Sequence, residues 1–132
     1  MLLNAPVNDA EVQNPIDGYP NMSIKDLLAQ VRLDLSKGEL LLTEKILLAM
    51  DIINRDIDFI EIVSEEQIRK YKRAVSYEAA ALICEDNLDF DTTTTGQVRG
   101  ENQQIKADSL RRIVQHTIAD LTNRPRNRVR LI

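Results

Sequence analysis

The side chains that could carry out covalent chemistry are few in this sequence. Cys84 is its one cysteine and His116 its one histidine, and together they could act as a nucleophile and a base. Neither stands in a catalytic motif. Cys84 falls on an apolar helical stripe, where packing in the core is the simpler interpretation, and His116 is expected at a cap or along a helix face. We therefore predict no catalytic residue, no enzyme and no cofactor.

Carboxylates occur in two groups that could hold a divalent cation. Neither group has the alternating ligands, central glycine and final glutamate of an EF-hand loop. One cysteine and one histidine are too few for a structural zinc site. Gly96 and Gly100 lack the Lys-Ser/Thr ending of a phosphate-binding loop, so we predict no metal or phosphate site. The two groups are Asp56, Asp58 and Glu61, and Glu85, Asp86, Asp89 and Asp91.

The basic residues form two clusters that favour a binding role. One, at the start of a predicted helix, is Arg69, Lys70, Lys72 and Arg73. The other lies in residues 124–132, which have no acidic side chain and in which arginines alternate with other residues. Alternation places the guanidinium groups on one side of an extended strand. Such a segment could follow phosphates, add a strand to a partner or lie in an acidic groove, and a solvated tail is the alternative.

Charge is distributed unevenly along the chain. The sequence carries a net charge of −4, but residues 1–66 hold 13 acidic and 5 basic side chains, whereas residues 67–132 hold 8 acidic and 12 basic. Opposite charges on two parts of a molecule can steer neighbouring copies together, or the two parts can fold against each other. The charge pattern leaves both interpretations open.

The composition predicts a single all-α domain. The chain has 132 residues, 43% of them hydrophobic and 29% charged, as is typical of one globular domain. Aromatic residues make up only 4%, so the core must be aliphatic, and the abundant Leu, Ile and Ala favour helices. No apolar run approaches the roughly 20 residues that cross a bilayer, and no signal peptide is visible. We expect an intracellular protein with no membrane contact.

Apolar spacing and capping residues predict a small bundle of about four helices. Ser23 with Asp26, and Ser64 with Gln67, have the spacing of helix-start capping pairs. We expect helices over about residues 24–37, 40–60, 65–90 and 102–122. The predicted apolar positions of the last three are Leu42, Ile46, Met50, Ile53, Ile57 and Ile60, then Ile68, Tyr71, Val75, Leu82 and Ile83, then Ile105, Leu110, Ile113, Val114, Ile118 and Leu121.

The other segments have no core of their own. Residues 1–21 hold three of the four prolines and are interpreted as an extended N-terminal arm. Residues 22–123 form the helical domain, and residues 124–132 an extended, arginine-rich C-terminal tail. The helical pattern is interrupted by a predicted loop of roughly ten residues, because Asp and Thr side chains compete for backbone hydrogen bonds. Its centre is Asp91, Thr92, Thr93, Thr94, Thr95 and Gly96.

Several stretches of the sequence are similar to a known family. The stretches are Ser76-Tyr77-Glu78-Ala79-Ala80-Ala81-Leu82, Asp89-Phe90-Asp91-Thr92-Thr93, and Leu110-Arg111-Arg112 through Arg124-Pro125-Arg126 to Leu131-Ile132. The residue types in these stretches, and the order of the stretches along the second half of the sequence, resemble those of the head completion (GPL) proteins of contractile-tailed temperate phages. The first half is similar in its order of a short helix, a glycine turn and a helix ending in Ile53-Asn54-Arg55-Asp56. The resemblance covers roughly residues 22–132.

The resemblance implies a structural protein of the virion's head–tail connector. Such proteins join the portal vertex after DNA packaging. Neighbouring copies form a ring below the portal, and we expect this ring to be a dodecamer. The ring helps to retain the DNA and presents a docking surface for the tail or its completion protein. Assembly is expected in the host cytoplasm. The expected portal contacts are Arg124, Arg126, Arg128, Val129, Arg130, Leu131 and Ile132, and the loop of residues 91–96 is a second candidate contact, with DNA or the tail.

A protein of a different functional class, a small helical DNA-binding regulator, is the alternative to a structural virion protein. A short helix followed by longer ones suggests a helix-turn-helix, and the two basic clusters would contact phosphates. The acidic pI of about 5.0 argues against it, since such domains carry a basic excess.

Overall fold

The computed structural model describes residues 11–31, 39–57, 60–88 and 94–122. A two-stranded antiparallel sheet comes first, with β1 at Glu11–Val12 and β2 at Met22–Ser23. Helices α1 (Ile24–Gln30), α2 (Glu39–Ile57), α3 (Glu65–Leu88) and α4 (Thr94–Thr122) follow. Within the described ranges the chain is a four-helix bundle with little strand, which confirms the predicted all-α class.

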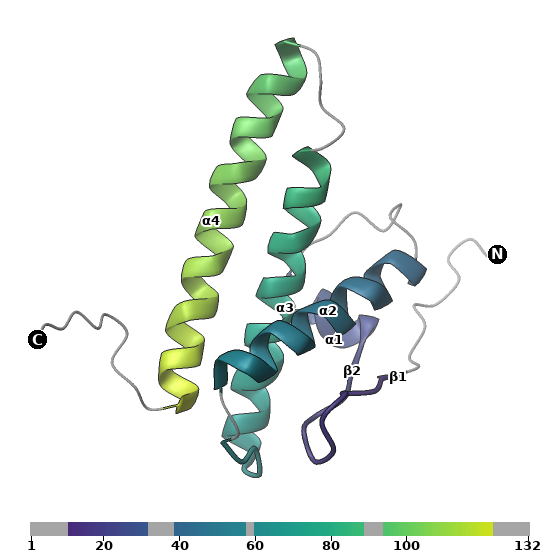
Figure 1. The fold of residues 1–132 in the computed structure, drawn as a ribbon, viewed down its shortest axis with the longest axis vertical. Helices are drawn as coiled ribbons and strands as arrows, with labels where there is room; N and C mark the ends of the chain where they lie inside the picture. Colours follow the sequence, from purple (N-terminus) through teal and green to yellow (C-terminus); the bar gives the residue numbers. More distant parts are fainter. Residues whose placement is uncertain (1–10, 32–38, 58–59, 89–93, 123–132) are drawn as a thin grey trace, which may run out of the picture.

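The two longest helices, α3 and α4, pack side by side along their length (Figure 1). The shorter α2 crosses α3, and α1 and the small sheet lie against α2 and α3. Ala81 and Cys84 of α3 pack in one buried cluster with Ala107 of α4, and α3 buries three further alanines, Ala74, Ala79 and Ala80. Small side chains let two helix axes approach closely, so this sequence favours a tight α3–α4 pair.

Both predicted capping pairs are confirmed. The backbone N–H of Asp26 donates to Ser23 Oγ at 3.1 Å, and the N–H of Ser23 donates back to the Asp26 carboxylate at 3.1 Å. At the start of α3 the N–H of Gln67 donates to Ser64 Oγ at 3.1 Å, and Gln67 Oε1 accepts from the N–H of Ser64 at 3.0 Å. Each pair satisfies N–H groups that a helix start leaves without a partner.

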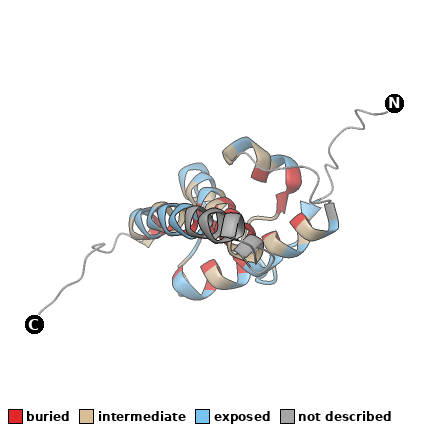
Figure 2. Cartoon of the chain, turned by 90° about the horizontal axis from the view of Figure 1, so that it is seen from above, coloured by how far each residue is buried: buried red, intermediate tan, exposed pale blue. Residues whose placement is uncertain are grey.

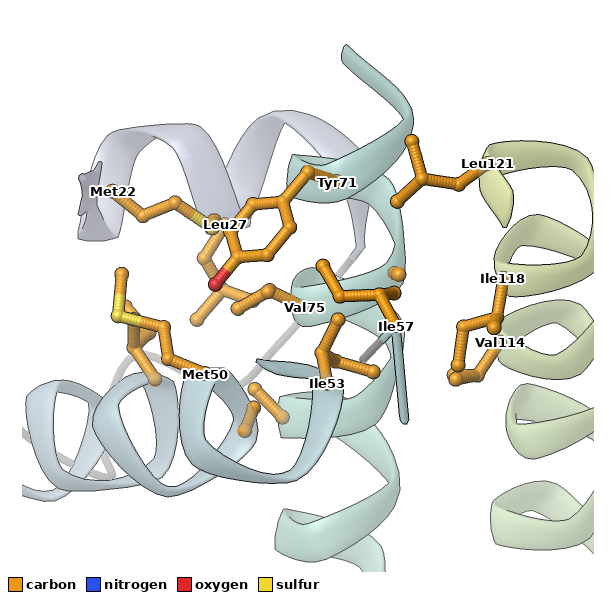
Figure 3. Close-up of a cluster of buried hydrophobic side chains, with 14 of the residues drawn as sticks. Met22, Leu27, Met50, Ile53, Ile57, Tyr71, Val75, Val114, Ile118 and Leu121 are labelled. Atoms are coloured by element: carbon orange, nitrogen blue, oxygen red, sulfur yellow. The ribbon is translucent and has the colours of Figure 1, made fainter. Parts of the chain in front are cut away.

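One hydrophobic core joins all four helices. The apolar stripe predicted for α2 is buried from Leu42 to Ile57, and it meets Tyr71 and Val75 of α3 (Figure 3). From the other side, Val114, Ile118 and Leu121 of α4 point toward α3 (Figure 3). Seen from above, the buried residues lie between the helices and the exposed ones outside (Figure 2).

Three of the predicted helix boundaries were wrong. The helix α1 is shorter than predicted and ends at Gln30. The helix α2 ends at Ile57 and not at Ile60, whose N–H donates to the carbonyl of Ile57 as the chain turns. The helix α4 begins at Thr94 and not near residue 102.

One predicted core position was also wrong. Ile105, predicted to be buried, is 64% exposed. Among the side chains of α4 that the structure describes, Ala107 is instead the first buried one, and Val114 and Leu121 are buried at intervals of seven residues after it. The small alanine lies in the contact with α3, and the larger isoleucine two residues earlier faces outward.

The segment from Glu11 to Asn21, the described part of the predicted arm, lies against the helices. Val12 and Tyr19 pack against the core. Between β1 and β2 the N–H of Tyr19 donates to the carbonyl of Ile16, and Gly18 has a φ of 94°, which glycine adopts without strain.

A ring of three polar side chains fastens this segment to the bundle. The Tyr71 hydroxyl donates to Asn54 Oδ1 at 2.5 Å, Asn54 Nδ2 donates to Asn14 Oδ1 at 3.0 Å, and Asn14 Nδ2 donates to Tyr71 Oη at 2.6 Å. Burial raises the pKa of Tyr71, so its hydroxyl remains protonated and able to donate. The ring joins the N-terminal segment, α2 and α3.

Replacing Tyr71 by Phe should destabilise the fold. The substitution removes one hydroxyl and leaves the buried Asn54 without its donor, which costs about 1 to 3 kcal/mol of unfolding free energy. Urea unfolding followed by circular dichroism measures the loss. Tyr77→Phe is the matched control, because Tyr77 is partly exposed, and should change stability by less than about 0.5 kcal/mol. Equal stability of the two variants would contradict the account.

Candidate functional site

The residues considered for nucleophilic chemistry are not brought together. Cys84 is 4% exposed and packs with Ala81 and Ala107 between α3 and α4, as expected for a core cysteine. Burial raises the pKa of its thiol, which disfavours the reactive thiolate. His116 is exposed on α4, nine residues or about 14 Å of helix rise beyond Ala107.

The described carboxylates of the second predicted group are engaged in ion pairs. Glu85 pairs with Arg111 of α4, and Asp86 lies 2.6 Å from Lys45 Nζ of α2. Within the described residues, no cluster of three or more His, Cys, Asp or Glu could hold a metal ion. Asp58, Asp89 and Asp91 lie outside the described residues.

Arg111 is the centre of the polar contact between α3 and α4. Its Nη2 lies 2.9 Å from Glu78 Oε2 and 3.1 Å from Glu85 Oε1, and its Nε also reaches Glu78. The hydrogen bonds that Arg111 donates to Glu85, and then those that it donates to Glu78, raise the pKa of Arg111. The Glu78 side chain is only 5% exposed, and among the described residues Arg111 is the cation that compensates its charge. The cluster acts as a structural lock, because its ion pairs join α3 to α4.

The first basic cluster forms an outward-facing strip on α3, which we call the α3 basic strip: Arg69, Lys70 and Arg73. Arg69 and Arg73 are exposed, and the Arg73 guanidinium lies 4.9 Å from the centre of the Tyr77 ring. Lys70 pairs with Glu66, whereas the fourth member of the predicted cluster, Lys72, points to Asp26 and fastens α1 to α3. The strip can bind an acidic surface or a phosphate chain.

The helix α2 has an exposed apolar surface that was not predicted from the sequence. Leu40, Leu47 and Leu48 are 79%, 36% and 43% exposed, and Glu44 and Asp51 lie on the same side of the helix. We call these five residues the α2 leucine face. Successive members of this face are four, three, one and three residues apart, so they lie on one side of a helix. That side differs from the side that carries the buried stripe. This difference in position was the signal in the sequence that could have revealed the face. Exposed apolar side chains gathered on one face are a common feature of protein-contact surfaces.

The predicted portal contacts, Arg124, Arg126, Arg128, Val129, Arg130, Leu131 and Ile132, lie outside the described residues. So do Asp91, Thr92 and Thr93 of the predicted loop. Thr94, Thr95 and Gly96 belong to the first turn of α4 and not to a loop. None of the described helices is both long and apolar enough to span a bilayer.

Comparison with known proteins gives one match. The model of the phage head completion protein (GPL) family matches residues 56–132, more than half of the chain. The chain belongs to this family. The matched range comprises α3, α4 and the arginine-rich residues 124–132, so the resemblance noted in the second half of the sequence is confirmed. No curated protein and no solved structure matches the chain.

Membership in the GPL family gives the chain a structural role in phage head assembly. Its described surface is consistent with that role, since it offers an apolar face and a basic strip. The lock around Arg111 and the cluster of Ala81, Cys84 and Ala107 both lie within the family-matched range, where they hold α3 and α4 together.

Replacing Arg111 by Ala should destabilise the GPL chain strongly. The nearly buried Glu78 would lose its cation, which we expect to lower the unfolding free energy by about 2 to 3 kcal/mol. Arg112→Ala is the matched control, because Arg112 is exposed and has no ion pair within the described part of the chain. It should cost less than about 0.5 kcal/mol. Chemical denaturation of both variants measures the difference, and a mild loss for both would show that the lock contributes little.

Cys84 should resist alkylation in the folded protein. Its burial and raised pKa both reduce the reactive thiolate, so labelling by iodoacetamide near neutral pH should be about 100-fold slower or more than in denaturant. Intact-mass spectrometry over time measures the rate. Fast, complete labelling of the native protein would place the thiol on an accessible surface.

Proposed function

We propose that the protein is the head–tail connector component that completes DNA-filled phage heads. It joins the portal vertex after packaging, forms a ring below the portal, helps to retain the DNA and presents the docking surface for the tail or its completion protein. The observation that carries the proposal is the family match over residues 56–132. The role requires no catalysis, and the protein resides in the virion after assembly in the host cytoplasm.

Contact between neighbouring copies uses the α2 leucine face and the α3 basic strip. The first surface is apolar with two exposed carboxylates, Glu44 and Asp51, and the second carries the exposed guanidinium groups of Arg69 and Arg73. The two surfaces are complementary in charge and lie on different helices. A head-to-tail contact between different surfaces forms a ring when its rotation closes. The ring, expected to have twelve copies, supplies the partner that the exposed leucines lack in a single chain.

The portal is contacted by the segment that contains Arg124, Arg126, Arg128 and Arg130. Four permanent positive charges without an acid favour an acidic or strand-accepting surface on the partner. The segment around residues 91–96 is a second contact, with packaged DNA or with the tail.

Charge reversal in the arginine-rich segment tests the portal contact. The full-length variant Arg126→Glu/Arg128→Glu/Arg130→Glu should remain helical and should lose head completion by about 100-fold or more, because several charge-assisted contacts become repulsive. The assay mixes the protein with DNA-filled heads lacking it, adds tails and counts infectious particles. The control Lys25→Glu/Arg55→Glu/Arg112→Glu makes the same charge change at exposed positions and should retain activity. Equal activity of both variants would contradict the portal contact.

A DNA-binding regulator is the second candidate, and the α3 basic strip is the observation that favours it. Duplex binding that weakens steeply with added salt, and that Arg69→Glu/Arg73→Glu abolishes, would support it. The connector proposal instead requires this variant to impair association between copies.

A further inference from the structure

A groove of about 320 Å³ lies between the β1–β2 turn and the segment that joins α2 to α3. Ile16 and Tyr19 line it from the turn, and Ile60 and Val63 line it from the joining segment. Val63 is 74% exposed and Ile16 is 36% exposed. The walls are therefore largely apolar and open to solvent, which is the character of a docking groove.

The groove has exposed carboxylates in its lining, those of Asp17 and Glu61. A third, Glu65, starts α3 two residues after the lining residue Val63. Within the described ranges none of the three carboxylates has an ion pair, so no paired cation there offsets their negative charges. An occupant with apolar side chains and several positive charges fits best.

Residues 124–132 of the same chain have this chemistry. They carry four arginines and no acid, together with Val129, Leu131 and Ile132. Of all stretches of this length in the sequence, this one has the highest density of arginine.

The place where α4 ends brings this segment to the correct end of the molecule. Leu121, one residue before the end of α4, is buried in the same core cluster as Ile62, which also lines the groove. In Figure 1 the end of α4 and the start of α3 lie at the same end of the bundle. Ten residues from position 123 can span at most about 33 Å.

We propose that, in the free protein, residues 124–132 dock into the groove of their own chain. The arginines pair with Asp17, Glu61 and Glu65, while the apolar residues at the end of the segment cover Ile16 and Val63. This contact concerns the protein before assembly and stands whether or not the segment later binds a portal. A partner that captures the segment must compete with the groove, so the free protein does not present it to wrong surfaces.

Disulfide trapping in the full-length chain tests the docking. The test variant Cys84→Ala/Val63→Cys/Leu131→Cys is oxidised with glutathione disulfide, and the monomeric and dimeric products are separated on a non-reducing gel. The matched control, Cys84→Ala/Leu40→Cys/Leu131→Cys, moves the first thiol to a position that is 79% exposed and lies about 25 Å along α2 from Ile57. A further variant adds Asp17→Lys/Glu61→Lys to the test variant, and circular dichroism verifies that all variants are folded.

The proposal predicts a monomeric disulfide product that forms about tenfold faster or more in the test variant than in the control, at a rate independent of protein concentration. The added lysines, or high salt, should slow trapping markedly, because the contact is charge-assisted. Equal rates for the two variants, dimers as the main product, or a rate indifferent to the lysines would overturn it. Because no phage head is present, this result is independent of the connector proposal.

Discussion

The close packing of α3 on α4 is the constraint on which the remaining structure depends. Ala81 of α3 and Ala107 of α4 pack together at the contact, and Arg111 pairs with two carboxylates of α3. In this pair, α3 contributes Tyr71 and Val75 to the hydrophobic core that it shares with α2 and α1. The family match covers both helices, so the part of the chain that defines the family also provides the scaffold.

Local features of this fold could be predicted from the sequence, whereas its long-range contacts could not. Ser64 and Gln67 are three residues apart, and their hydrogen bonds depend on little else. Asn14 and Tyr71 are separated by 57 residues, and nothing near Asn14 indicates that it belongs to a buried polar ring. The burial of Ala107 in place of Ile105 likewise depends on what α3 presents, since both positions fit a helical pattern.

For the candidate surfaces too, the sequence predicted local features but not long-range contacts. Sequence composition identified the basic residues of α3, but only the structure separates Arg69 and Arg73, which face outward, from Lys72, which is bound to Asp26. Leu40, Leu47 and Leu48 of α2 lie off the predicted apolar stripe, and the structure shows that they are exposed on one side of the helix. A small helical protein that leaves leucines exposed beside carboxylates, and arginines on another helix, is suited to assembly with copies of itself.

The central claim is that this chain completes filled heads, and co-sedimentation of the purified protein with DNA-filled, tailless phage heads tests it most directly. Empty proheads and free duplex DNA are the controls. The account predicts saturable binding to filled heads alone, at a stoichiometry that matches the symmetry of a ring at the portal vertex. Equal binding to free DNA with no binding to heads would contradict it and would assign the basic residues to nucleic-acid recognition.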